Sequence, residues 1–247
     1  MKVKPRSIIG FCLVTLVAFG FATQAADPDH DPRALDVLQR MVEFKATLKK
    51  VRLEGEVYAD ARVGAGLMAI NSSTIEVQIQ RPDSMHVTIR DDIETKELYF
   101  QNGTLTVFNS ANGYYAQAEV PPSIGDAVEF AVEEFGIDAP VLDLLHRNAA
   151  QQLTEGADEI IYLTQSTVRG VLCDQIAVRL PEVDLQIWVS AGDEPLPRKI
   201  VLTSKWEGGA PRHTTFMTWD TNPRLRKSTF EFRPPEGATE IQFAPAH

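Results

Sequence analysis

The residues able to do acid–base, nucleophilic or metal chemistry are few in this sequence and form no recognisable motif. Its five histidines are scattered, and no two follow the HxH or HExxH spacing that places two imidazoles on one metal ion. No serine lies in a GxSxG elbow. We therefore predict a protein that is not an enzyme, with no catalytic residues, no metal site and no cofactor.

Two isolated features could still suggest chemistry. Cys173 is the one cysteine that would remain after removal of an N-terminal signal, so an internal disulfide is excluded. It fits either a buried apolar position on a strand or a thiol that dimerises under oxidising conditions. Gly64-Ala65-Gly66 lacks the further glycine and helix of a phosphate loop, and it predicts a flexible connection.

Two tryptophans are candidates for a binding patch. Trp188 falls on the polar-face parity of its strand, beside Gln186, and Trp219 shares parity with Met217 while Phe216 takes the other face. A large aromatic side chain on an exposed face can mark an interaction surface. The other interpretation is that an edge of the sheet or the N-terminal helix covers these rings. We carry Trp188 and Trp219 forward as surface aromatic candidates.

The N-terminus predicts export. Three basic residues lie within the first six, an uncharged apolar run of about 14 residues follows over 8–21, and Thr23-Gln24-Ala25 provides a peptidase site. The run is shorter than the roughly 20 residues that a membrane-spanning helix needs. We expect 1–25 to be a cleaved signal peptide and 26–247 to be one soluble periplasmic domain with no further transmembrane segment.

The charge balance excludes one class of partner. The chain has 34 acidic and 24 basic residues, a net charge of −10, and the expected signal removes basic residues only. An acidic surface repels phosphate backbones and anionic lipid surfaces. The sequence also lacks a basic cluster with interleaved aromatic residues. We predict no nucleic-acid partner.

The elements that position these residues are mostly strands. Asp31 and Pro32 are typical of a helix start, and apolar spacing extends this helix to about residue 48. Period-two alternation follows, which predicts strands with one buried face. We expect about ten or eleven antiparallel strands, the last ones over 197–206, 211–220 and 228–233. A tail should pack along an edge.

A helical insertion interrupts the strands at 123–147. Ser123 with Asp126 resembles a capping box, and apolar residues at helical spacing follow as far as Phe135. Gly136 should close that helix, and Pro140 should open a short second one.

Several stretches, in order along the chain, resemble a predicted periplasmic family, domain of unknown function 2092. They are Arg81-Pro82-Asp83, Asn102-Gly103-Thr104-Leu105, Gly170-Val171-Leu172-Cys173-Asp174, Asp184-Leu185-Gln186-Ile187-Trp188, Pro195-Leu196-Pro197-Arg198-Lys199-Ile200 and Phe230-Glu231-Phe232-Arg233-Pro234-Pro235-Glu236-Gly237-Ala238. That family is similar to the lipoprotein carriers LolA and LolB. The resemblance implies a highly curved antiparallel sheet forming an unclosed β-barrel, with helices across its concave face and an apolar cavity between them. No residue matches the carriers' functional arginine or membrane-insertion loop.

Residues of the insertion and the sheet could line such a cavity. The candidates are Ile124, Val128, Ala131, Phe135, Val141, Leu144 and Leu145 of the insertion and Met85 and Val87 of the sheet. The leading hypothesis is a non-enzymatic periplasmic carrier or sensor of a hydrophobic ligand, which would be a lipid, an acyl chain or an acylated protein. The alternative is a module that binds another envelope protein and has a filled core without ligand.

Overall fold

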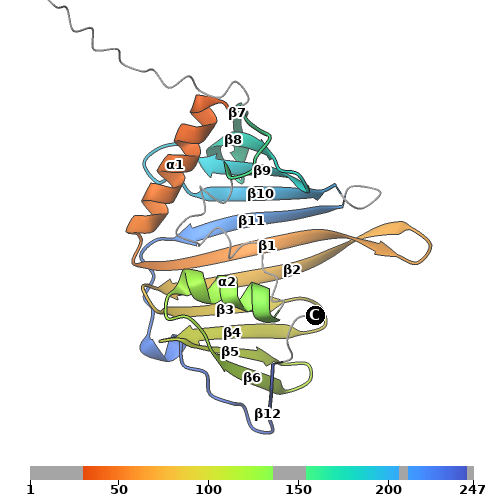
Figure 1. The fold of residues 1–247 in the computed structure, drawn as a ribbon, viewed down its shortest axis with the longest axis vertical. Coiled ribbons are helices and arrows are strands. Elements are labelled where there is room, and N and C mark those ends of the chain that lie inside the picture. The colour runs from red at the N-terminus through yellow and green to blue at the C-terminus, as the bar shows by residue number, and fades with distance from the viewer. Residues whose placement is uncertain (1–29, 136–153, 206–210, 244–247) are drawn as a thin grey trace, which may run out of the picture.

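A computed structural model describes residues 30–135, 154–205 and 211–243. In these residues twelve strands form one sheet accompanied by helices (Figure 1). The helices are α1 (Pro32–Thr47), α2 (Ile124–Phe135) and the 3-10 helix η1 (Lys227–Thr229). The strands are β1 (Lys50–Val63), β2 (Leu67–Gln80), β3 (Ser84–Arg90), β4 (Thr95–Gln101), β5 (Thr104–Asn109), β6 (Tyr114–Glu119), β7 (Glu159–Val168), β8 (Val171–Arg179), β9 (Val183–Ser190), β10 (Pro197–Ser204), β11 (Arg212–Asp220) and β12 (Thr239–Ile241).

The sheet consists of two antiparallel meanders placed side by side. Its order is β12-β6-β5-β4-β3-β2-β1-β11-β10-β9-β8-β7, so β1–β6 form one meander and β7–β11 the other. The meanders join through β1 and β11, which pair from Arg52 opposite Asp220 to Ala59 opposite His213. Among the described strands β7 and β12 are the two edges and do not pair. The predicted curved, unclosed antiparallel sheet is therefore confirmed (Figure 1).

Both helices begin where the local sequence predicts. The Asp31 carboxylate caps α1 by accepting the N–H of Arg33 at 2.8 Å. Ser123 caps α2 by accepting the N–H of Asp126 at 3.3 Å, and its hydroxyl donates to the Asp126 carboxylate at 2.6 Å. The second helix that we expected from Pro140 lies outside the described residues, as do the expected signal peptide and its cleavage site.

The two helices cover the same face of the sheet, which we call the inner face; the opposite one is the outer face. Figure 1 shows α1 beside β7–β10 and α2 across β2–β4. The apolar stripes of both helices join one buried cluster with alternate residues of the strands, including Leu53, Val77, Phe100, Ile176 and Ile187. The period-two alternation in the sequence thus reflects this single apolar face.

The C-terminal strands differ from the prediction. Residues 228–233, expected to be a strand, form η1 and irregular chain that crosses the outer face. The ring of Phe232 packs there against Tyr99, Phe108 and Tyr115, with centroids 5.1–5.8 Å apart, and this packing replaces strand pairing. Farther along, β12 pairs parallel to β6, so the tail packs along an edge of the sheet as we expected. With β12 included, the sheet has twelve described strands.

The β1–β2 hairpin is longer than predicted. We expected a connection between Asp60 and Ile75, but pairing continues to Val63 opposite Leu67. Residues 67–73 lack a clear apolar–polar alternation, so their sequence did not indicate a strand. Gly64 and Gly66 have positive φ angles of 55° and 112°, which places the lone GxG in the tight turn of this hairpin.

Candidate functional site

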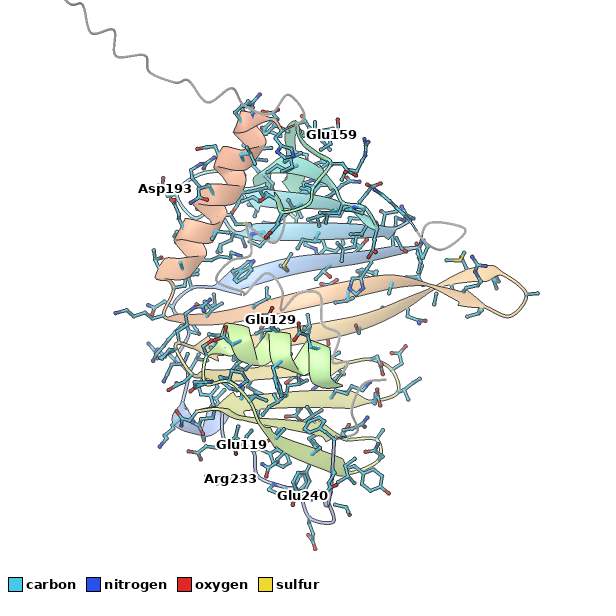
Figure 2. The ribbon with its side chains drawn as sticks, in the orientation of Figure 1. Glu119, Glu129, Glu159, Asp193, Arg233 and Glu240 are labelled. Carbon is cyan, nitrogen blue, oxygen red and sulfur yellow. The ribbon has the colours of Figure 1, made fainter. Side chains whose placement is uncertain are left out.

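The inner face beneath α2 brings together the predicted cavity residues that the structure describes. Ile124, Val128 and Ala131 of α2 are buried in one cluster with Met85 and Val87 of β3. The opposite side of α2 is exposed and carries Glu129 (Figure 2). The remaining candidates, which are the side chain of Phe135 and residues Val141, Leu144 and Leu145, lie outside the described part. Contact of these residues with a ligand stays a prediction.

Strands β1, β10 and β11 carry apolar side chains on the inner face that are only half-buried. These are Val57 of β1, Leu202 of β10 and Trp219 of β11, all at the margin of the inner cluster. Trp219 lies opposite Leu53, and its indole N–H donates to the carbonyl of Pro197 at 2.7 Å. The surface position expected for Trp219 is therefore wrong: its pairing with β1 puts the ring on the inner face.

A polar network borders the inner face near the start of α1. The Tyr162 hydroxyl donates to the buried Asp174 carboxylate at 2.8 Å, and the Gln165 amide donates to it at 3.0 Å. The Arg33 guanidinium lies 3.9 Å from the centroid of the Tyr162 ring. Desolvation and the bond to Asp174 raise the pKa of Tyr162. The network satisfies a buried carboxylate and links α1 to β7 and β8.

Trp188 lies on the outer face, as its parity predicted, but it is not a surface aromatic. Its side chain is only 8% exposed, and its indole N–H donates to the Ser166 hydroxyl at 3.0 Å. The Lys199 ammonium lies 4.3 Å from its ring centroid. The rest of the Trp188 ring is covered by Val168, Cys173 and Val201, which form a small cluster with it on the outer face. Cys173 is thus a buried apolar residue, and burial raises the pKa of its thiol.

A cavity of about 300 Å³ lies on the outer face over β1, β2 and β3. Arg169 reaches it from the β7–β8 turn and binds Glu56 with both guanidinium nitrogens, at 2.8 and 2.7 Å. These bonds hold the pKa of Glu56 below its usual range. Arg52 pairs with Glu54 and Glu76 at 2.8 and 2.9 Å. The glutamates that line this cavity are therefore already paired with arginines in salt bridges.

A second outer cavity, of about 380 Å³, lies beneath the C-terminal segment and is lined by Tyr99 and Phe232 among others. His86 stacks on Tyr99 with ring centroids 4.1 Å apart, and its Nε2 is 3.2 Å from the Glu97 carboxylate. Glu97 comes from β4, the strand that pairs with β3. The bond to His86 lowers the pKa of Glu97, whereas desolvation and Glu97 raise that of Tyr99.

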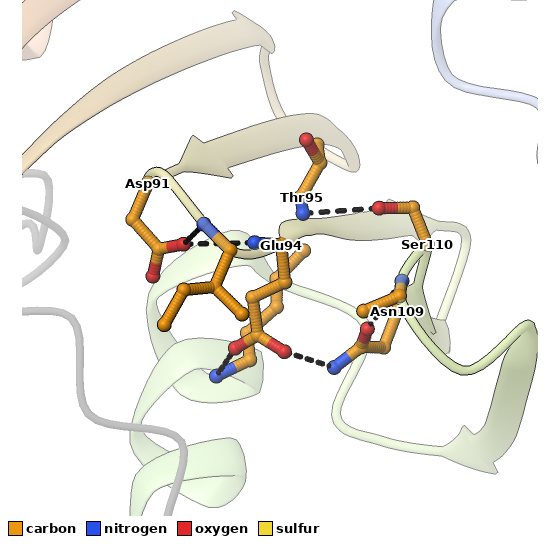
Figure 3. A network of polar contacts seen from close by, with 8 residues as sticks. Asp91, Glu94, Thr95, Asn109 and Ser110 are labelled. Carbon is orange, nitrogen blue, oxygen red and sulfur yellow. Dashed lines mark hydrogen bonds and ion pairs between the residues drawn. The ribbon is translucent and has the colours of Figure 1, made fainter.

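The acidic β3–β4 turn has a structural role (Figure 3). Asp91 accepts the backbone N–H groups of Ile93 and Glu94, both at 2.8 Å, and these bonds hold its pKa below the usual range. Glu94 accepts the side-chain amide of Asn109 at 2.7 Å. Asp91 therefore stabilises this turn, and Glu94 fixes the turn to the end of β5.

Two further observations bear on function. In the described ranges no three His, Cys, Asp or Glu side chains are grouped closely enough to hold a metal ion. None of the described helices combines the length and hydropathy needed to cross a bilayer.

Comparison with known proteins gives one family match. The model of a family described as "Predicted periplasmic protein (DUF2092)" matches residues 34–244. No curated protein matches the sequence.

Solved structures of similar architecture have low sequence identity. The lipoprotein LppX of Mycobacterium tuberculosis is 10% identical, with 79% of this chain and 100% of that one covered and a TM-score of 0.46. LprF of Mycobacterium bovis is 11% identical, with 80% and 97% covered and a TM-score of 0.48. A LolA superfamily protein of Nitrosomonas europaea is 10% identical, with 81% and 97% covered and a TM-score of 0.40. No residue role is transferred from them.

Proposed function

The chain belongs to the DUF2092 family of predicted periplasmic proteins, and from this premise we propose that it binds a hydrophobic ligand as a non-enzymatic carrier or sensor. The ligand class is a lipid, an acyl chain or the acyl group of a lipoprotein. The ligand would lie on the inner face between α1 and α2. Its expected contacts include the predicted residues Ile124 and Val128.

One observation carries this proposal: half-buried apolar side chains lie on the inner face of β1, β10 and β11. Val57, Leu202 and Trp219 are half-buried, whereas Met85 and Val87 beneath α2 are fully buried. Fully buried side chains of the same strands, such as Leu53 and Met217, lie beside them. An apolar face on which some side chains remain half-exposed is a suitable surface for an acyl chain. Trp219 adds a large flat ring whose polar N–H is already satisfied.

Apolar burial is large enough to drive such binding. Each buried CH₂ group contributes about 0.8 kcal/mol, so an acyl chain with roughly twelve buried methylenes gains about 10 kcal/mol. Association costs about 4–15 kcal/mol in lost motion. A net affinity therefore requires a preformed site, and a sheet with helices fixed on one face supplies such a rigid surface.

A second candidate function, an envelope protein-binding module with a filled core, is favoured by the packing under α2. Ile124 and Ala131 pack there against side chains of β3 with almost no exposure. If the rest of the inner face is packed in the same way, no acyl chain can enter. Binding of an apolar probe therefore separates the two candidates.

The test is titration with cis-parinaric acid, a fluorescent fatty acid, on the full protein. Val57→Asn places an amide on the inner face, and Tyr58→Asn makes the matched change on the outer face of the same strand. We expect Val57→Asn to weaken binding about tenfold, because burying a valine side chain gives roughly 1.5 kcal/mol. Tyr58→Asn should bind like the wild type. Energy transfer from tryptophan to the probe should fall in Trp219→Phe much more than in Trp188→Phe.

Absence of saturable probe binding would count against the proposal and in favour of the filled module. Equal losses in Val57→Asn and Tyr58→Asn would mean that the probe binds elsewhere.

A further inference from the structure

The end of the β1–β2 hairpin projects beyond every neighbouring described strand (Figure 1). β11 pairs with β1 no farther than Ala59, and β3 pairs with β2 no farther than Thr74. Residues 60–63 and 67–70 therefore have only each other as strand partners in the described chain. We call this pair of segments, with the turn between them, the ribbon tip. An isolated two-stranded tip has no core of its own to bury apolar side chains.

The ribbon tip nevertheless exposes large apolar side chains on both of its faces. Leu67 and Ile70 are 70% and 69% exposed, and Val63 and Met68 are each 40% exposed. Val63 pairs with Leu67 on the side continuous with the inner face, whereas Met68 and Ile70 lie opposite Arg62 and Asp60 on the other side. Apolar groups presented all round a projecting tip suit a surrounding apolar medium better than one flat partner.

The charge of this segment also differs from the rest of the chain. Residues 60–75, which include the ribbon tip, contain one acidic residue, Asp60, and one cation, Arg62, in a protein with 34 acidic residues and a net charge of −10. Asp60 lies at the base of the tip, where its carboxylate accepts the backbone N–H of Arg212 at 3.0 Å. The acidic β3–β4 turn is set back from the tip: Leu67 lies seven residues beyond Thr74, which is about 23 Å at 3.3 Å per residue. Charges at that distance are screened, because the Debye length is about 8 Å at physiological salt.

We propose that the ribbon tip docks on the surface of a lipid bilayer. Leu67, Met68 and Ile70 enter the boundary between headgroups and acyl chains. The insertion is shallow, because the unpaired edges of the ribbon carry N–H and C=O groups that hydrocarbon cannot satisfy. The acidic remainder of the molecule is repelled by the same surface, which orients the tip toward it.

Docking extends the proposed function but does not depend on it. From Val57 through Ala59 and Ala61 to Val63, the inner-face side chains of β1 are apolar and connect the inner face with the tip, beside the polar partners Ser73 and Asn71 of β2. A bilayer at the tip would thus adjoin the surface on which we place the ligand. A protein with a filled core could dock in the same way.

The test is co-sedimentation of the full protein with phosphatidylethanolamine–phosphatidylglycerol vesicles. The variant Leu67→Ser/Ile70→Ser is compared with Leu163→Ser/Leu172→Ser, which changes two leucines of β7 and β8 that are 46% and 50% exposed. We expect the tip variant to partition at least about tenfold more weakly and the control to match the wild type. Thermal melts should agree for all three proteins, because surface substitutions change stability little.

A tryptophan probe gives an independent readout of depth. In Ile70→Trp, vesicles should shift the emission of the new indole to shorter wavelength, and lipids brominated near the headgroup should quench it. Absence of vesicle binding by the wild type, or equal binding by the tip variant, would overturn the proposal. So would a tip-dependent dimer in sedimentation velocity without vesicle binding, since exposed strand edges can pair with a second copy. Titration of the same samples with cis-parinaric acid is evaluated separately. Membrane docking and ligand binding can therefore each fail without the other.

Discussion

At the scale of single residues, the least expected group is Lys45, whose side chain lies buried beneath α1. Burial and the nearby Arg81 guanidinium lower the pKa of Lys45 from its ordinary 10.5 to about 7. Below about pH 7 the ammonium is charged in both folded and unfolded protein, and the fold carries the full cost of burying it. Between about pH 7 and 10.5 the folded state has released this proton while the unfolded state retains it, so stability rises with pH.

The first prediction concerns this cost. Lys45→Met keeps most of the side-chain volume and removes the charge, so the free energy of unfolding should rise by a few kcal/mol at pH 6. The gain should be clearly smaller at pH 9.5, where the folded wild-type protein holds a neutral amine. Urea unfolding at both pH values measures the two gains; an equal gain at both would contradict the lowered pKa.

The residue pattern predicted which face of a strand a side chain takes better than it predicted how exposed that side chain is. The outer-face position of Trp188 follows from its alternation with Ile187, but its cover comes from Lys199 and from the β7–β8 hairpin, which pack there only in the folded chain. Trp219 was assigned to the wrong face because alternation within one strand does not say which face the helices cover. Leu67 and Ile70 belong to an apolar run beside Gly66 that contains no acidic residue. That run could have indicated the exposed apolar tip.

At the scale of elements, the C-terminal segment shows how tertiary packing overrides a local pattern. Residues 228–233 have the alternation of a strand, yet Phe230 is buried and Phe232 contacts three aromatic rings as the chain crosses the outer face. Pro234-Pro235 cannot donate to a ladder, which ends any strand there. The helix caps at Asp31 and Ser123, by contrast, are local and were predictable.

The second prediction tests this segment. Phe232→Ala should lower the free energy of unfolding by about 2 kcal/mol, because three aromatic contacts are lost from a half-buried side chain. Ile241→Ala removes an exposed apolar side chain from β12 and should cost no more than about 0.5 kcal/mol. Urea unfolding compares them. A Phe232→Ala protein as stable as the control would show that the segment is only loosely attached.

At the scale of the whole molecule, the fold depends on the contact between β1 and β11, residues more than 150 positions apart in the chain. Local alternation predicted strands and one apolar face, and the family resemblance implied the unclosed sheet. Neither could give this pairing, which depends on the packing of both meanders against one set of helices. The candidate site was predicted in part: Ile124, Val128, Ala131, Met85 and Val87 are brought together, whereas Trp219 joined the inner face unpredicted.

The measurement that tests the central claim most directly is mass spectrometry of what the protein carries. Protein purified from the periplasm without detergent is extracted with organic solvent, and the organic phase is compared with that of Val57→Asn prepared in parallel. We predict a lipid or acyl species at close to one per chain in the wild type and a clearly reduced amount in the variant. Repeated extraction of no lipid, together with an inability to take up a fatty acid probe, would contradict the claim and leave the filled interaction module as the better account.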